Sequence, residues 1–198
     1  MHSETPFRLA VVIVFVVSLA ISGYFRYQAR RPGEEISRQG EGRLLFLAIR
    51  LGGLALFLAT LLYLIRPAWL AWASIPLPGA IRWLGAVLGA GALVVLYWTL
   101  NSLGGNLTDT VVTRAQHTLV VGGPYRWIRH PFYISFLLLV GAVSLLASNA
   151  LLAVIGIVVF ALLAIRTPIE EQNLEERFGE EYRQYKLRTG RFLPKVRR

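Results

Sequence analysis

Residues 131–165 contain no charged side chain, and this run constrains the fold more than any other part of the chain. Ser148 and Asn149 divide it into two apolar arms of similar length. Each arm would measure about 25 Å as an α-helix, somewhat less than the ~30 Å hydrocarbon core of a bilayer. Local thinning of the bilayer, or extension of the helices past His130 and Arg166, would supply the difference. The run therefore predicts a tight hairpin of two short transmembrane helices.

The composition also indicates an integral membrane protein. Of the 198 residues, 55% are hydrophobic and only 16% are charged, too few for the surface of a water-soluble domain. The absence of cysteine excludes disulfides and thiol nucleophiles. With three histidines, one of them near the N-terminus, we expect no metal site. The net charge of +10 indicates basic loops near anionic lipid rather than a nucleic-acid partner.

Three further apolar segments precede the hairpin, at residues 9–25, 44–65 and 81–100. The first is near the lower length limit for a spanning helix, and a cleaved signal peptide is the alternative; we favour a retained helix. Arg50 interrupts the second segment, and we expect its side chain to snorkel to the interface, a buried contact with a lipid phosphate or an acceptor being the alternative. Together with the hairpin, these segments predict about five transmembrane helices.

Small and aromatic residues mark contacts of the spans. Gly85 and Gly89 are spaced as GxxxG and Gly91 follows, so another helix can approach closely, and we expect that helix to belong to the same chain. Trp69 and Trp72 lie in a proline-rich turn between the second and third spans. They predict an aromatic belt at the membrane interface.

The chain turns polar after the hairpin, and we expect an amphipathic helix over 168–187. Its apolar stripe, spaced by four, four and three residues, consists of Leu174, Phe178, Tyr182 and Tyr185. Thr167 as N-cap, Pro168 and Glu170 form a capping box that predicts its start. Thr189-Gly190 predicts its end, and the segment 192–194 is expected to fold back as an apolar tail.

The distribution of charge predicts the orientation. With the N-terminus outside, the loop 26–43, the segment 101–130 and the C-terminal tail all face the cytoplasm, and they hold most of the 21 lysines and arginines. We therefore predict an all-α polytopic membrane protein with a C-terminal amphipathic cytoplasmic helix. Its expected parts are a three-helix transmembrane part, 1–100, and a C-terminal part, 101–198, that holds the polar segment, the hairpin and the amphipathic helix.

Polar residues gather just before the hairpin, where His130 precedes Pro131. Proline is well placed as a first helical residue, so one interpretation is a helix start whose arginines and tryptophan anchor at the headgroups. The other interpretation is a polar pocket lined by Tyr125, His130 and Tyr133. Both remain open on spacing alone.

The other end of the hairpin carries Arg166 and Glu170. Taken alone, Arg166 is a common interfacial anchor and Glu170 a member of the capping box. If the hairpin closes, however, both charges return beside His130. An arginine for an anion, a carboxylate for a cation and a histidine would then share one site, which suits a zwitterionic cofactor with an amphiphilic acceptor.

At these residues the chain resembles the isoprenylcysteine carboxyl methyltransferase family, including its prokaryotic relatives, and more loosely the phospholipid N-methyltransferases. The matching residues are His117-Thr118-Leu119-Val120, Gly123-Pro124-Tyr125, Arg129-His130-Pro131-Phe132-Tyr133, Arg166, Glu170-Glu171, Phe178-Gly179-Glu180-Glu181-Tyr182 and Tyr185. Their order and spacing together are specific, although each piece alone is weak. The first three spans match only as hydrophobic helices.

The resemblance implies an S-adenosylmethionine-dependent methyltransferase whose site lies between the last membrane helices and the cytoplasm. It implies that Arg166 faces the acceptor as the catalytic residue. The implied cofactor-binding residues are His117, Thr118, Leu119, Val120, Tyr125, His130, Pro131, Tyr133 and Glu170. The chain departs from the eukaryotic members in having Pro168-Ile169 where they carry a longer acidic run, and in lacking their extra N-terminal helices. Acceptor specificity is therefore not carried over.

The acceptor implied is a lipophilic or lipid-anchored molecule that enters from the bilayer, with a carboxylate favoured because it needs no general base. An amine, as in a phospholipid N-methyltransferase, must lose a proton, and His130 is the nearby candidate base. The competing functions are an NADPH-dependent membrane reductase and a non-enzymatic membrane scaffold. The arginine-histidine-proline turn and the acidic pair after Arg166 favour the methyltransferase over the reductase.

Overall fold

The computed structural model describes residues 4–29, 42–104 and 118–195. Their elements are α1 (Thr5–Ala29), α2 (Arg43–Ile65), the 3-10 helix η1 (Pro67–Ala73), α3 (Gly79–Leu103), the 3-10 helix η3 (Gly123–Arg126), α4 (Pro131–Ala147), α5 (Ala150–Phe178) and α6 (Glu180–Arg188). Within these residues, four helices (α1, α2, α3 and α5) are long and apolar enough to cross a membrane. The fifth apolar helix, α4, has 17 residues. The prediction of an all-α polytopic membrane protein is confirmed.

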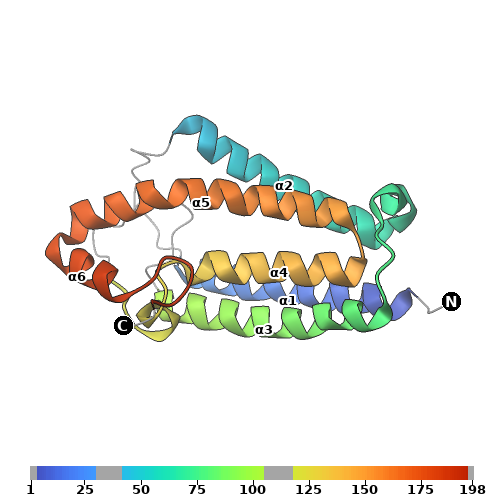
Figure 1. Ribbon diagram of the computed structural model, residues 1–198, viewed down its shortest axis with the longest axis horizontal. Helices are drawn as coiled ribbons and strands as arrows, with labels where there is room; N and C mark the ends of the chain where they lie inside the picture. The colour runs from blue at the N-terminus through green and yellow to red at the C-terminus, as the bar shows by residue number, and fades with distance from the viewer. Residues whose placement is uncertain (1–3, 30–41, 105–117, 196–198) are drawn as a thin grey trace.

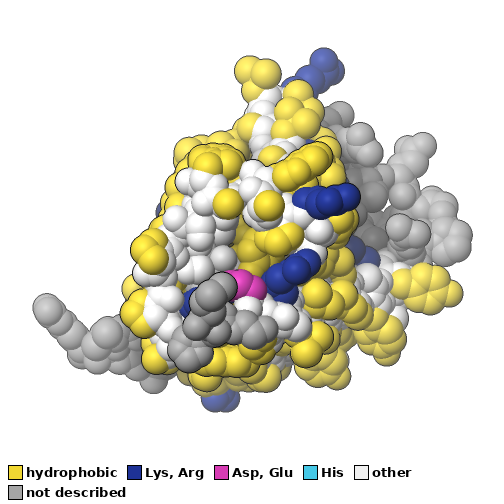
Figure 2. Space-filling view, turned by 90° about the vertical axis from the view of Figure 1, so that its right-hand side faces the viewer, with side chains coloured by type: hydrophobic (Ala, Val, Ile, Leu, Met, Phe, Trp, Pro, Cys, Tyr) yellow, Lys and Arg dark blue, Asp and Glu magenta, His cyan; other side chains and the backbone are white. Residues whose placement is uncertain are grey.

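The long helices run side by side along one axis of the molecule (Figure 1). One layer holds α1, α3 and α4, with α4 packed most extensively on α3, and the other holds α2 and α5. The chain begins at one end of the bundle, and α6 and the C-terminal tail lie at the opposite end (Figure 1). Exposed large hydrophobic side chains are spread along α1, α2, α3 and α5, and the view onto the N-terminal end of the bundle shows hydrophobic side chains around its rim (Figure 2). Such a surface suits lipid rather than water.

The hairpin of α4 and α5 forms as predicted, and its turn is closed by polar side chains. Ser148 adopts a left-handed backbone conformation with φ 52°. The side chain of Asn149 caps α5 by accepting hydrogen bonds from the backbone N–H groups of Leu151 and Leu152. Its amide also donates to the carbonyl oxygen of Leu70, at 3.0 Å. The turn is thereby fixed to η1, at the end of the bundle where the N-terminus lies.

Two of the three glycines predicted to allow close helix packing do so. A methyl group added at Gly85 would lie 2.8 Å from the carbonyl oxygen of Ala142, and one added at Gly89 would lie 2.8 Å from Val14. The close neighbours are α4 and α1 of the same chain, as expected. Gly91 differs, because nothing lies within 4 Å of the place its Cβ would occupy.

The predicted helix start at Thr167 is wrong. The helix α5 continues through Pro168 to Phe178, so Thr167 is not an N-cap. Instead, the buried Thr167 hydroxyl donates to the carbonyl oxygen of Leu163, one turn earlier in the same helix, at 3.0 Å. A proline removes one helical hydrogen bond, yet α5 is helical on both sides of Pro168. The expected helix over 168–187 is therefore two helical segments.

The break between these segments lies at Gly179, whose φ of 54° favours glycine. Tyr182 and Tyr185 of α6 are buried, so this part of the predicted apolar stripe faces inward, whereas Leu174 and Phe178 of α5 are half-buried. The predicted stop is confirmed, because α6 ends at Arg188 and Thr189 follows in an extended conformation.

The spans also extend further than their apolar cores suggest, because polar residues at their ends find partners. Arg82 of α3 is only 6% exposed. Its guanidinium binds both carboxylate oxygens of Glu4 at 2.8 Å and the carbonyl oxygen of Leu146. The same guanidinium lies 3.8 Å from the ring centroid of Phe7. These contacts join the starts of α1 and α3 to the end of α4.

Residues predicted to lie at the membrane interfaces are exposed. Arg50 is exposed on the first half of α2, with its guanidinium 5.1 Å from the Phe46 ring centroid, which agrees with snorkelling. Trp69 and Trp72 of η1 are 68% and 74% exposed. The two tryptophans lie at the end of the bundle opposite the start of α2, which fits the predicted aromatic belt.

Candidate functional site

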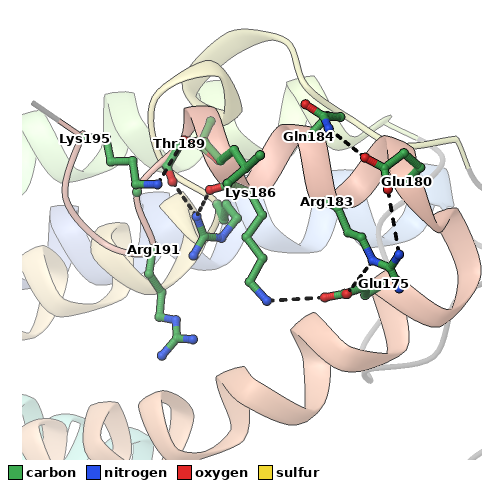
Figure 3. Close-up of a pocket in the computed structure, with 11 residues that line it drawn as sticks. Glu175, Glu180, Arg183, Gln184, Lys186, Thr189, Arg191 and Lys195 are labelled. Atoms are coloured by element: carbon green, nitrogen blue, oxygen red, sulfur yellow. Dashed lines mark hydrogen bonds and ion pairs between the residues drawn. The ribbon is translucent and has the colours of Figure 1, made fainter. Parts of the chain in front are cut away.

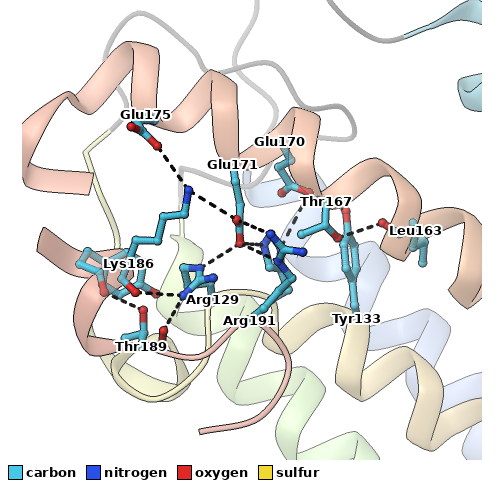
Figure 4. Close-up of polar contacts among 12 residues, drawn as sticks. Arg129, Tyr133, Leu163, Thr167, Glu170, Glu171, Glu175, Lys186, Thr189 and Arg191 are labelled. Carbon is cyan, nitrogen blue, oxygen red and sulfur yellow. Dashed lines mark hydrogen bonds and ion pairs between the residues drawn. The ribbon is translucent and has the colours of Figure 1, made fainter. Parts of the chain in front are cut away.

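A cluster of charged and aromatic side chains lies at the end of the bundle where α4 begins (Figure 4). The apolar part of α5 ends at Ile165, and the polar remainder of this helix projects beyond the start of α4 (Figure 1). Three segments meet there: the residues before α4, the polar half of α5, and the tail after α6.

The tail runs beside the residues that precede α4 and is hydrogen-bonded to them. The backbone N–H of Arg129 donates to the carbonyl oxygen of Gly190 at 2.9 Å, and that of His130 donates to Arg191 at 3.1 Å. The N–H of Gly190 donates in turn to Trp127 at 3.1 Å. The sequence predicted that the tail folds back, and the structure shows that it folds onto the stretch containing His130.

Glu171 is the centre of the cluster, with only 2% of its surface exposed. Its carboxylate accepts hydrogen bonds from Nε of Arg129 and Nη2 of Arg191, each at 2.9 Å. Nε2 of His130 lies 3.3 Å away and Nζ of Lys186 lies 4.0 Å away (Figure 4). A single buried carboxylate therefore joins α5 to the start of α4, to α6 and to the tail.

The surroundings keep Glu171 ionised. Burial alone would raise the pKa of its carboxyl, but hydrogen bonds from His130, Arg191 and Arg129 outweigh burial and hold the pKa well below the ordinary value. The negative charge in turn compensates Arg129, whose side chain is only 9% exposed. Removing either partner would leave a charge buried without compensation.

Glu170 lies next to Glu171 but faces a different part of the cluster, because adjacent residues are about 100° apart around a helix. The Tyr133 hydroxyl donates to Oε2 of Glu170 at 2.6 Å, and Nδ1 of His130 lies 3.9 Å from the same oxygen. The rings of His130 and Tyr133 stack, with centroids 5.3 Å apart. The Glu170 side chain stays 27% exposed, so this carboxylate remains open to a ligand.

Tyr125, on η3, belongs to the same cluster. It is buried, and its carbonyl oxygen accepts a hydrogen bond from the Tyr185 hydroxyl at 2.7 Å. Burial raises the pKa of Tyr125 well above its ordinary value, and the nearby charge of Glu170 adds to this effect. Tyr125 therefore stays neutral beside Glu170 and can donate a hydrogen bond.

The structure brings together four residues that the sequence predicted for the site: Tyr125, His130, Tyr133 and Glu170. Pro131 is buried as the first residue of α4, as predicted. Arg166 is half-buried and lies one helical turn before Glu170 on the same side of α5. Thr118, Leu119 and Val120 lie in an irregular segment before η3. His117 lies outside the described residues.

The sequence analysis gave no site role to Arg129, Glu171, Arg191 or Phe192, although Arg129 and Glu171 are among the residues that carry the family resemblance. One signal was available for Glu171. Leu163, Thr167 and Glu171 are spaced by four residues, so a continuous α5 places Glu171 on the buried side of the helix. The capping-box interpretation obscured this four-residue spacing, because it started a new helix between Leu163 and Glu171.

An open pocket of about 610 Å³ lies on the outer side, between the end of α5, α6 and the tail (Figure 3). Its charged side chains bind one another: Arg183 and Lys186 reach Glu175 at 2.8 and 3.4 Å. Nζ of Lys195 donates to the carbonyl oxygen of Leu187 at 2.9 Å. Glu170 and Tyr133 do not line this pocket. We interpret the pocket as a solvated polar surface.

The fold and the cluster define a helical membrane protein with a polar site at one end of its bundle. The model of the isoprenylcysteine carboxyl methyltransferase (ICMT) family matches residues 84–176. Over this stretch, which runs from α3 through most of α5, the chain is similar to this family. The match begins within α3, earlier than the stretch from His117 onward that carried the resemblance in the sequence, so the third span is also part of the family pattern.

The chain is also similar to individual proteins that are named as methyltransferases. The chain is 33% identical over 126 residues to protein-S-isoprenylcysteine O-methyltransferase of Rattus norvegicus, a match that covers 59% of this chain and 43% of the relative. It is 33% identical over 115 residues to the Saccharomyces cerevisiae protein of the same name, covering 54% and 48%. It is also 36% identical over 74 residues to methanethiol S-methyltransferase of Pseudomonas deceptionensis, covering 37% and 28%. The chain thus spans less than half the length of these relatives.

The fold is shared with a solved structure described as the eukaryotic intramembrane Ras methyltransferase ICMT. The TM-score is 0.53 at 19% sequence identity, and the match covers 93% of this chain and 67% of that one. At this identity the likeness concerns the arrangement of helices.

Proposed function

We propose that this chain is an integral membrane methyltransferase that uses S-adenosylmethionine to methylate a lipophilic or lipid-anchored acceptor, with a carboxylate as the favoured acceptor group. The observation that carries the proposal is the partly exposed carboxylate of Glu170, held by Tyr133 beside His130 where the apolar bundle ends. The similarity of residues 84–176 to the ICMT family supports the methyl transfer. The reductase and scaffold alternatives are not favoured, because the relatives are named as methyltransferases.

The residues present fit the proposed cofactor. S-adenosylmethionine would supply an activated methyl group on a sulfonium, together with an ammonium and a carboxylate that the protein must recognise. Glu170 is an anion with an exposed edge and suits the ammonium. Tyr125 offers a neutral hydroxyl donor, and the stacked rings of His130 and Tyr133 offer flat faces around it. Thr118, Leu119 and Val120 would contribute backbone groups.

The task of the chain is then chiefly to align the reacting groups. Methyl transfer is an in-line displacement, in which the bond from carbon to the acceptor forms as the bond from carbon to sulfur breaks and sulfur keeps the electron pair. Arg166, one turn from Glu170, would orient a carboxylate acceptor by a charge-assisted hydrogen bond. The carboxylate becomes an ester without losing a proton, so no general base is required.

We infer that the site faces the cytoplasm and the N-terminus lies outside. The positive-inside rule favours this orientation. The end of α1, the start of α2, the end of α3 and the start of α4 all lie at the same end of the bundle as the site (Figure 1). The described basic residues at these ends, such as Arg26, Arg43, Arg126 and Arg129, therefore gather on one side of the membrane.

The first experiment is to titrate the purified protein with S-adenosylhomocysteine and with NADPH. We expect S-adenosylhomocysteine to bind, and binding of NADPH alone would contradict the proposal. The second is to supply membranes containing the protein with labelled S-adenosylmethionine and to separate the lipid and protein fractions. We expect label in a lipophilic product that base hydrolysis releases as methanol, as a methyl ester requires. Base-stable label would identify an amine or a thiol as the acceptor instead.

A further inference from the structure

Phe192 places an aromatic ring from the polar tail directly against the candidate site. Its ring centroid lies 5.8 Å from that of His130, 6.4 Å from that of Tyr133 and 5.7 Å from that of Phe160. His130 and Tyr133 belong to the polar cluster, whereas Phe160 belongs to the apolar part of α5. The Phe192 ring therefore lies on the boundary between the polar site and the membrane-spanning bundle.

The ring is held there by the residues beside it. The carbonyl oxygen of Arg191 accepts the backbone hydrogen bond of His130, and the Arg191 guanidinium binds the buried Glu171 at 2.9 Å. The next residue, Leu193, points away and is 76% exposed. The tail thus directs the Phe192 side chain toward the site and leaves the Leu193 side chain exposed.

Phe192 packs against an apolar cluster contributed by α2, α4 and α5. Its buried members include Tyr133, Val159 and Leu163, and partly buried side chains such as Ile49 of α2 and Phe136 of α4 pack against them. Phe192 belongs to this cluster although it comes from outside the membrane-spanning segments. An amphiphile with its polar group near Glu170 and Arg166 would extend its hydrocarbon chain past this ring into the apolar cluster.

We propose that Phe192 is a specificity-determining residue that contacts the hydrocarbon part of the acceptor next to its reacting group. This inference rests on the proposed methyltransferase function and deepens it. An aromatic ring offers a large apolar surface at low entropic cost. It selects acceptors that carry an apolar chain close to the methylated atom, because a small polar acceptor leaves this surface exposed to water.

The test compares acceptors that share a carboxylate and a thioether and differ only in their alkyl chain: (methylthio)acetic acid and (decylthio)acetic acid. The variants are Phe192→Ala, Phe192→Leu and, as matched control, Leu193→Ala. Each is reconstituted in lipid nanodiscs, and three quantities are measured: affinity for S-adenosylhomocysteine, affinity for each acid, and kcat/KM for methyl transfer.

For Phe192→Ala we expect affinity and kcat/KM for the decyl acid to fall about tenfold, while those for the methyl acid change less than about twofold. S-adenosylhomocysteine should bind as in the wild type, Phe192→Leu should restore most of the loss, and Leu193→Ala should behave as the wild type. Equal losses for both acids would overturn the proposal and assign Phe192 a structural role. A gain with the decyl acid would also overturn it, because the ring would then obstruct the chain.

The two proposals fail in different ways. If the wild type binds the decyl acid but transfers no methyl group to any acceptor, the proposed function is contradicted, and the binding difference between the acids still decides the role of Phe192. If the wild type transfers methyl groups and Phe192→Ala shows no dependence on chain length, the proposed function stands and the inference about Phe192 is wrong.

Discussion

Glu170 and Glu171 are neighbours in the sequence, but the turn of α5 places them in different environments. Glu171 is buried among Arg129, Arg191 and His130, and its charge is fully engaged in holding the segments of the site together. Glu170 touches Tyr133 and remains partly exposed. At the scale of single residues, we therefore assign ligand binding to Glu170 and structural support to Glu171.

Glu170→Gln should weaken binding of S-adenosylhomocysteine about tenfold or more, equivalent to ~1.4 kcal/mol, with little change in thermal stability. The amide keeps an oxygen for the Tyr133 hydroxyl but loses the charge proposed to hold the ligand ammonium. Isothermal titration calorimetry provides the measurement. Glu181→Gln on the exposed face of α6 is the matched control. Unchanged affinity in Glu170→Gln would refute the assignment of this residue to the cofactor.

Glu171→Gln should instead destabilise the protein, by about 3 kcal/mol, because the mostly buried Arg129 loses its counter-charge. Glu175→Gln is the control, since Glu175 is paired with Arg183 and Lys186 at the surface, and such pairs contribute little. Unfolding in mixed detergent micelles would compare the two variants. Equal small effects would show that the buried network does not stabilise the fold.

The same carboxylate predicts a dependence of stability on acid pH. The pKa of Glu171 is lowered in the folded state, whereas in the unfolded chain it takes the ordinary value of 4.5. The stabilisation is therefore fully present above pH 4.5 and is lost as the pH falls below it. We expect the free energy of unfolding of the wild type to fall more steeply below pH 4.5 than that of Glu171→Gln. Parallel curves would contradict this account.

At the scale of elements, the continuity of α5 decides the geometry of the site. If a new helix began at Pro168, Arg166 would lie on a different element from Glu170. In the structure the helix continues through Pro168 to Phe178, so Arg166 and Glu170 lie one turn apart on one rigid element. The division of the chain into parts at residues 1–100 and 101–198 remains a prediction, and the extensive packing of α3 on α4 joins helices from both.

Pro168→Ala distinguishes the two arrangements. In a continuous helix, alanine restores a helical N–H and removes a poor helix former, so the protein should become more stable by about 1–2 kcal/mol. At the first position of a helix, where proline is favoured, the same change should be neutral or destabilising. The midpoint of thermal unfolding gives the sign. Gln172→Ala, on the exposed side of α5, should have little effect and serves as the control.

At the scale of the whole molecule, the bundle separates two ends with different chemistry. One end carries the exposed tryptophans of η1 and the Arg82–Glu4 pair. The other end carries the cluster around Glu171 and the basic tail (Figures 1 and 4). The length of the apolar helices between them is what a bilayer requires, so the two ends face opposite sides of the membrane.

The lack of cysteine in the chain allows a direct test of orientation. Ala71→Cys in η1 and Lys195→Cys in the tail each introduce a single exposed thiol, one at each end of the bundle. With a membrane-impermeant maleimide, Lys195→Cys should react in inverted vesicles only and Ala71→Cys in intact spheroplasts only. The reverse pattern would place the site outside.

The sequence by itself determined the membrane class, the helical hairpin and the end of α6, and it indicated that Glu170 would approach His130 if the hairpin closes. The uncharged runs and the local turn residues are visible over short stretches of the sequence. The approach of the two ends of the hairpin follows from its closure. Family resemblance added the expected chemistry to the same residues.

Only the tertiary structure decided that α5 passes through Pro168, that Glu171 is buried, and that Arg191 and Phe192 complete the site. Each of these depends on contacts between residues far apart in the chain, such as Arg129 with Thr189 or Glu171 with His130. The capping-box pattern favoured a helix start at Thr167, but in the continuous helix Thr167 is buried and Glu171 is paired with the tail and with the residues before α4. The physical reason is that the free energy of burying and pairing a charge is set by partners that local spacing does not specify.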